Sequence, residues 1–223
     1  MPARGFHFGV VWRPQRREIG TTTRRAPDGA GCARTVAIVA SGVHDESVSR
    51  HRDPGLRHIV VIRHAKSNWD DPSLADHARP LSKRGRNALA RLRDHIEGLE
   101  LRPDLVMCSS SRRTRETLAG IRPAVGRKTR VETDSALYGA GAEQLVTELR
   151  RLDDQVTTVF LIGHNPGVAD LVSLLAPGSA TGAAAIDAFP TAAVAVLSVA
   201  GPWSALRPAC ALLESFWAPR QPG

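Results

Sequence analysis

Short apolar runs alternate with amphipathic segments along the chain from Arg57 to about Phe216. The first run, residues 59–62 (IVVI), is apolar and β-branched at every position, which is typical of a strand buried on both faces. The expected strands cover residues 59–63, 104–108, 130–133, 157–162, 192–199 and 209–216. The expected helices cover residues 83–97, 113–121, 142–152 and 168–175. This alternation predicts an α/β fold, a three-layer sandwich in which helices flank a mainly parallel central sheet.

The composition is that of a globular protein, with 42% hydrophobic and 23% charged residues. No apolar run approaches the roughly 20 residues that a membrane-spanning helix needs, so we expect a cytoplasmic protein without a membrane segment. The three cysteines and eight histidines show neither disulfide-framework nor zinc-ligand spacing. We therefore expect no metal and no cofactor.

Basic residues are in excess and are densest near the N-terminus. The chain has 30 Lys and Arg against 22 Asp and Glu, a formal net charge of +8, which favours anionic partners. Residues 1–56 hold nine arginines against five acids, and only residues 35–40 (TVAIVA) have the pattern of regular structure. We interpret residues 1–56 as a basic, flexible N-terminal extension and residues 57–218 as the folded domain.

Cationic and imidazole side chains follow three of the expected strands. Arg63 and His64 follow the first strand, Arg113 lies just beyond the second, and His164 follows the strand at residues 157–162. In parallel α/β sheets, ligands bind beyond the carboxyl ends of the strands. Taken singly, each residue is explained as well by capping or solvation as by function. Because they follow three separate strands, we expect them to meet at one sheet edge.

Two histidines and two or three arginines around one point suit phosphoryl transfer. Preorganised guanidinium groups stabilise the charge spread over the phosphoryl oxygens, and an Arg fork binds two oxygens at once. A neutral imidazole attacks phosphorus and holds it covalently, which divides one difficult step into two. This chemistry needs no metal.

Four motifs together resemble a known family. They are VVIRHAKSNW, the D-x-x-R-P-L-S-x-x-G block of residues 76–85, the S-x-x-x-R-x-x-x-T block of residues 109–117, and LIGHNPG. The order resembles the histidine phosphatase (phosphoglycerate mutase-like) superfamily, and within it the short SixA-type phosphohistidine phosphatases. The resemblance covers Arg57 to about Phe216. It implies the phosphoglycerate mutase-like sandwich and a phosphohydrolase.

The resemblance also implies roles for individual residues. His64 would be the nucleophile that becomes phosphorylated, Arg63 and Arg113 would bind the phosphoryl oxygens, and His164 would be the second imidazole of the pocket. Arg79 matches a further basic position of the SixA-type branch. Three residues that follow the nucleophile are further candidates for substrate binding: Ser67, Asn68 and Trp69.

The chain departs from the family pattern in three ways, one of which is Ser110 at a position where many members have Pro. Ala65 replaces the usual Gly after the histidine, which is tolerated if its φ is negative. The insertion that carries the general acid in larger members is missing, so the proton donor is open. The candidates are Asp76, Glu143 and Asp70. A missing acid matters less for phosphohistidine, whose imidazole can leave already protonated, and this favours a P–N substrate.

The leading interpretation is a metal-independent phosphatase that forms phospho-His64 and acts on a phosphorylated protein or a small phosphorylated metabolite. One alternative is a phosphomutase, against which the short chain between the motifs argues. The other is a non-catalytic phosphate- or polyanion-binding module. With 4% aromatic residues and no DNA-binding motif spacing, we do not expect nucleic acid as a partner. The physiological substrate and the oligomeric state remain open.

Overall fold

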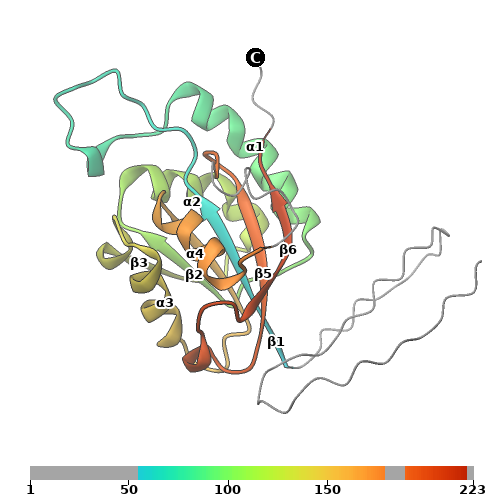
Figure 1. Cartoon of the computed structure of the whole chain (residues 1–223). Helices are drawn as coiled ribbons and strands as arrows, with labels where there is room; N and C mark the ends of the chain where they lie inside the picture. The colour runs from blue at the N-terminus through green and yellow to red at the C-terminus, as the bar shows by residue number, and fades with distance from the viewer. Residues whose placement is uncertain (1–54, 179–188, 220–223) are drawn as a thin grey trace, which may run out of the picture. The chain divides into compact units, whose positions relative to one another are not determined.

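The computed structural model describes residues 55–178 and 189–219 (Figure 1). The predicted N-terminal extension, with its apolar run at residues 35–40, lies outside the described residues and stays a prediction. The domain boundary at residue 57 also stays a prediction, although the first strand begins close to it, at Leu56.

Within the described residues, six strands form one sheet. They are β1 (Leu56–Arg63), β2 (Leu105–Ser109), β3 (Arg130–Asp134), β4 (Thr158–Gly163), β5 (Val194–Ala200) and β6 (Ala211–Trp217). Their order is β3-β2-β4-β1-β5-β6. Strands β3, β2, β4 and β1 are parallel, whereas β5 and β6 pair antiparallel along the β1 edge. The predicted mainly parallel sheet is confirmed.

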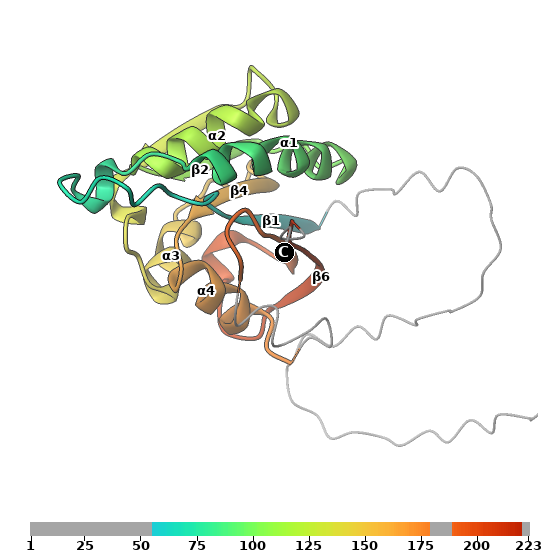
Figure 2. The same ribbon diagram turned by 90° about the horizontal axis from the view of Figure 1, so that it is seen from above.

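Helices cover both faces of the sheet. They are α1 (Lys83–Gly98), α2 (Arg112–Val125), α3 (Ala142–Arg150) and α4 (Gly167–Leu175). Figure 2 shows α1 and α2 on one face and α3 and α4 on the other. Along β1, Ile59 and Val61 join the core under α3 and α4, whereas Val60 and Ile62 join the core under α1 and α2. The IVVI run is apolar throughout because both of its faces are buried, and the three-layer α/β sandwich is confirmed.

Several element boundaries differ from the sequence-based expectation. Helix α2 runs four residues past Ile121, with Pro123 inside it, because Ala124 and Val125 are buried in the core. Strands β5 and β6 each begin two residues later than expected, since Ala192 and Ala209 have φ angles of 64° and 57°. A residue in the left-handed region cannot continue a strand.

The register of the parallel strands aligns their carboxyl ends. Arg63 at the end of β1 pairs with Gly163 at the end of β4, and Cys108 near the end of β2 pairs with Ile162 of β4. The segments that follow these three strands therefore begin at the same end of the sheet. These segments contain the cationic and imidazole residues named in the sequence analysis. No helix in the described ranges is long and apolar enough to cross a membrane.

Candidate active site

His64 follows β1 with its side chain almost completely buried, at 7% exposure. Its Nδ1 lies 2.7 Å from the carbonyl oxygen of Ala65. Since a carbonyl only accepts, Nδ1 carries the proton and Nε2 keeps its lone pair. Burial is the largest of the effects that lower the pKa of His64 to about 4; the charges of Arg113 and Arg63 act in the same direction, and the Ala65 hydrogen bond opposes them. His64 is therefore a neutral imidazole at neutral pH, with Nε2 as its nucleophilic atom.

Arg113 lies in the first turn of α2 and connects the groups of the site. Its Nε donates to Nε2 of His64 at 3.2 Å, and its Nη2 lies 3.3 Å from Nδ1 of His164. The same guanidinium donates through Nη1 to the backbone oxygen of Asp76 at 2.6 Å and through Nη2 to its carboxylate at 2.9 Å. One buried cation thus contacts both imidazoles and a carboxylate.

His164 follows β4 and is 8% exposed. Its ring centroid lies 5.0 Å from that of His64, and its Nε2 lies 2.8 Å from Oγ of Ser109 at the end of β2. Burial lowers the pKa of His164 to about 3, with His64 and Arg113 adding to the effect. With Nδ1 accepting from Arg113, the neutral ring carries its proton on Nε2 and donates to Ser109.

The segment after β4 leads into helix α4 through Asn165 and Pro166. Pro166 is the N-cap of α4 and follows a cis peptide bond, and the side chain of Asn165 donates to the backbone oxygen of Phe189 at 3.2 Å. Asn165 therefore ties the segment after β4 to the segment before β5.

Two further arginines, Arg63 and Arg79, lie next to these groups. Arg63 donates through Nη1 to the backbone oxygen of Phe189 at 2.7 Å. Arg79 is 9% exposed, and its Nε lies 3.9 Å from Oδ1 of Asp76. Within the part of the chain that is described, neither Arg63 Nε nor Arg79 Nε has a hydrogen-bond partner. Both guanidinium groups retain donor capacity for an anion.

The segment that follows His64 contains the other predicted binding residues. Ser67 forms an isolated antiparallel bridge with Leu81, and its Oγ accepts from Nε1 of Trp69 at 3.0 Å. Trp69 is 61% exposed, and the centroid of its ring lies 4.1 Å from the Arg79 guanidinium carbon. Asn68 uses its amide oxygen within its own turn, accepting from the backbone N–H of Asp70. Ser67 and Asn68 therefore shape this segment, whereas Trp69 presents an exposed ring.

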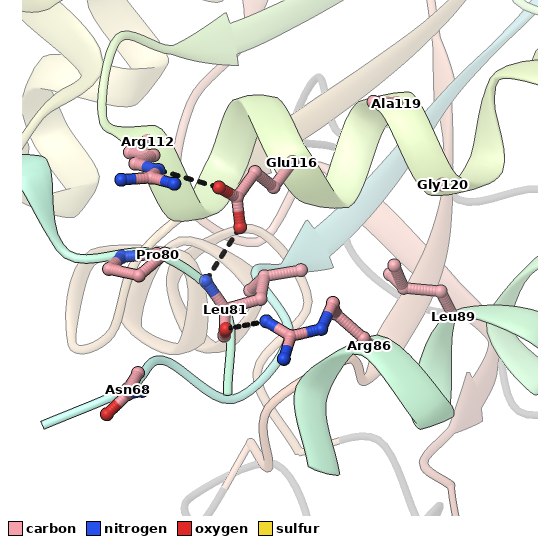
Figure 3. A pocket seen from close by; sticks show the side chains of 9 residues that line it. All are labelled: Asn68, Pro80, Leu81, Arg86, Leu89, Arg112, Glu116, Ala119 and Gly120. Carbon is pink, nitrogen blue, oxygen red and sulfur yellow. Dashed lines mark hydrogen bonds and ion pairs between the residues drawn. The ribbon is translucent and has the colours of Figure 1, made fainter. Parts of the chain in front are cut away.

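A pocket of about 420 Å³ lies behind this segment, between α1 and α2 (Figure 3). Glu116 of α2 accepts there from the backbone N–H of Leu81 at 2.7 Å and from Nε of Arg112 at 2.7 Å. Arg86 of α1 donates to the carbonyl oxygen of Leu81 at 2.5 Å. Charged groups of both helices thus fix Leu81, and through the bridge to Ser67 they hold the segment after His64. Glu116 carried no role in the sequence analysis.

The proton-donor candidates lie in different surroundings. Asp76 is in the site, where its Oδ2 accepts from the Tyr138 hydroxyl at 2.6 Å and from Arg113. The Tyr138 hydrogen bond and then Arg113 hold the pKa of Asp76 below its ordinary value, although partial burial opposes them. Glu143 is exposed in the first turn of α3, and Asp70 is exposed in the turn after Trp69. Among the described residues, no hydrogen bond or ion pair joins either of those two carboxylates to the site.

Sequence reasoning missed three contributors. Tyr138 was left without a role, yet its ring lies edge-on to His164 at a centroid distance of 5.4 Å. Ser109 and Thr117 stood in a quoted motif without roles; Thr117 Oγ1 accepts from the Ala65 backbone N–H at 3.0 Å. Their spacing from Arg113 in S-x-x-x-R-x-x-x-T was the available signal, whereas Tyr138 gave none.

Comparisons with known proteins identify the family of the chain. The family model of the histidine phosphatase superfamily (branch 1) matches residues 59–151. The chain belongs to this superfamily. An uncharacterised protein of Mycobacterium tuberculosis is 37% identical over 163 residues, covering 71% of this chain and all of that protein.

Two solved structures are similar over most of the domain. A candidate phosphohistidine phosphatase SixA from Nakamurella multipartitia is 30% identical, with a TM-score of 0.65 over 74% of this chain and 97% of that one. The corresponding protein of Agrobacterium tumefaciens is 25% identical, with a TM-score of 0.63 over 73% and 98%. The SixA-like branch and the class of enzyme, a phosphohydrolase, are as predicted. Ala65 fits the position of the usual Gly: it is fully buried and has no positive φ.

Proposed function

We propose that this histidine phosphatase hydrolyses phosphohistidine, or a small phosphoester, without a metal ion and through a phosphohistidine intermediate on His64. The observation that carries the proposal is the state of Nε2 of His64. It is unprotonated because Nδ1 donates to Ala65, and it lies 3.2 Å from Nε of Arg113. An unprotonated nitrogen nucleophile thus accepts a hydrogen bond from a cation that can bind the group it attacks.

The first step transfers the phosphoryl group to the enzyme. The lone pair of His64 Nε2 forms a bond to phosphorus while the bond from phosphorus to the leaving atom breaks. An imidazole leaving group that is protonated on its other nitrogen takes the electron pair and departs neutral. Arg113, Arg63 and Arg79 supply the positive charge for the phosphoryl oxygens, the role that a metal ion has in other phosphatases.

The second step returns the enzyme to its starting state. Nδ1 of His64 keeps its proton against the Ala65 carbonyl, so the intermediate is a phosphoimidazolium, which is a good leaving group. Water attacks phosphorus, the P–N bond breaks, and the electron pair returns to Nε2. Inorganic phosphate leaves, and the protons of the water pass to phosphate and solvent. His164, whose ring centroid lies 5.0 Å from that of His64, is placed beside the phosphoryl group in both steps.

The surroundings of Asp76 bear on the substrate. A carboxyl group whose pKa is held below its ordinary value is ionised at neutral pH and has no proton to give. We therefore propose that Asp76 orients Arg113, through the two hydrogen bonds to that guanidinium, and does not act as the acid. A substrate whose leaving group needs no proton from the enzyme then reacts fastest, which favours phosphohistidine over alkyl esters.

The test is burst labelling with a radiolabelled phosphodonor such as acetyl phosphate, in the presence of a chelator. Wild type and His64→Ala are compared with His58→Ala, which alters the same strand at its other end. We expect acid-labile, alkali-stable label on wild type and His58→Ala and none on His64→Ala. Label that passes to an added alcohol and not to water would indicate a phosphomutase. Absence of label and turnover on wild type with every donor would indicate a phosphate-binding module.

A further inference from the structure

Trp69 is an exposed aromatic side chain that is nevertheless held in place. The residue is 61% exposed. Its Nε1 donates to Oγ of Ser67 at 3.0 Å, and the Arg79 guanidinium carbon lies 4.1 Å from the ring centroid. The segment that bears it is fixed by the backbone hydrogen bond from Asn68 to Pro80 at 2.8 Å. One ring face is therefore covered by a cation, while much of the indole meets solvent in a set orientation.

The exposed position has no evident structural benefit. Burying a tryptophan releases a large apolar area from water, so an indole left in solvent forgoes that stabilisation. The residue that supports it, Arg79, is nine-tenths buried, and no hydrogen-bond partner of its Nε occurs in the described ranges. Arg79 is thus a buried cation with donor capacity, stacked on the exposed ring of Trp69. This pair suits a ligand that is anionic at one end and apolar at the other.

A short series of contacts links Trp69 to the nucleophile. Arg79 Nε is 3.9 Å from one carboxylate oxygen of Asp76, and the other oxygen of Asp76 is 2.9 Å from Arg113. Arg113 in turn contacts Nε2 of His64. A phosphoryl group bound between these arginines would therefore have Trp69 at the rim, next to whatever group the phosphorus carries.

We propose that Trp69 is a stacking platform for a planar leaving group and determines substrate specificity. The enzyme then prefers phosphoryl groups attached to a planar ring, such as the imidazole of phosphohistidine or an aryl oxygen, over those attached to an amine or an aliphatic alcohol. This inference rests on the proposed function and names the substrate class of the same site. Stacking on one aromatic ring is expected to be worth about tenfold in kcat/KM.

The test uses pairs of substrates that differ in the ring. N-phosphoimidazole is compared with phosphoramidate, and phenyl phosphate with methyl phosphate, for wild type, Trp69→Ala and Trp69→Phe. Leu212→Ala is the matched control, because Leu212 is an apolar residue of β6 with the same 61% exposure. We expect Trp69→Ala to lose about tenfold in kcat/KM on both ring substrates and less than twofold on the ringless ones. Trp69→Phe retains most of the preference, and Leu212→Ala retains all of it.

Two results would overturn the proposal while leaving the proposed function intact. An equal loss on ring and ringless substrates would mean that Trp69 only supports Arg79. No loss on any substrate would mean that the ring touches nothing in the reaction. If wild type neither turns over phosphoramidate nor becomes labelled on His64, the proposed function fails and the platform fails with it.

Discussion

Nε of Arg113 donates to Nε2 of His64 at 3.2 Å, so a permanent cation adjoins the nitrogen of the His64 ring that carries no proton. A protonated His64 would place two positive charges in contact at this position. The arrangement therefore disfavours the protonated imidazole and offers the same cation to a phosphoryl group. Burial acts in the same direction and is the larger effect on the pKa.

This relationship predicts the acid limb of the pH profile. A free imidazole loses its nucleophilic form below about pH 6.5, but the pKa of His64 is lowered to about 4. A lowered pKa means that the neutral form persists to lower pH. We expect kcat/KM to fall only near pH 4, once the ionisation of the substrate phosphate has been subtracted.

NMR titration of the histidine rings checks this directly. Arg113→Ala removes a charge that lowers the pKa of His64, so the His64 titration should move upward in that variant. A midpoint near 6.5 for His64 in the wild type would contradict the expectation.

Replacing Arg113 by lysine should be nearly as harmful as replacing it by alanine. The guanidinium uses all three of its nitrogens at once, on His64, on the Asp76 backbone and on the Asp76 carboxylate. A lysine ammonium is a single point and cannot reproduce this fork. We expect both variants to lose roughly 100-fold or more in kcat/KM, a scale typical of a lost transition-state donor. Arg115→Lys, on the exposed side of the same helix, should change kcat/KM less than twofold. A kcat/KM of Arg113→Lys close to that of the wild type would contradict the requirement for all three guanidinium nitrogens.

Much of the fold followed from hydrophobic pattern. The continuous IVVI run identifies β1 because both faces of that strand are buried. The helical spacing of the leucines identifies α1 because only one face of that helix is buried. Boundaries were less predictable where single backbone conformations decided them, as at Ala192 and Ala209. The gathering of His64, Arg113 and His164 was predictable because parallel strands align their carboxyl ends.

The connections within the site were not predictable. The hydrogen bond from Tyr138 to Asp76 joins residues 62 positions apart, and no period or motif spacing encodes that contact. Asp76 appeared in the sequence as a possible acid, since sequence shows a carboxyl group but not its partners. Its two donors, Tyr138 and Arg113, lower its pKa below the ordinary value of a carboxyl group and so disfavour a role as the acid.

The role proposed for Asp76 predicts how its loss depends on the leaving group. If Asp76 orients Arg113, Asp76→Asn should lower kcat/KM by a similar factor, of the order of tenfold, on phosphoramidate, aryl phosphates and alkyl phosphates. A general acid would instead matter more as the leaving group becomes more basic. A series of aryl phosphates of graded leaving-group pKa measures the difference. A steeper dependence in Asp76→Asn than in wild type would restore Asp76 as the acid, and Tyr138→Phe should reproduce a weaker form of the same uniform loss.

The glycine of the D-x-x-R-P-L-S-x-x-G block has a steric reason that can be tested on the folded protein. A side chain on Gly85 in the first turn of α1 would clash with the backbone carbonyl of Lys66, which already accepts from the Ser82 N–H at 2.9 Å. Relieving that clash requires the helix or the segment after His64 to move.

We expect Gly85→Ala to lower the free energy of unfolding by roughly 1–3 kcal/mol and to raise KM, because the segment that bears Trp69 shifts. Gly98 ends the same helix with open space around its Cβ position, so Gly98→Ala should change stability by less than about 1 kcal/mol and leave KM unchanged. Urea unfolding of the two variants, with KM for an aryl phosphate, decides the matter, and equal behaviour of the two would show that the close approach at Lys66 has no consequence.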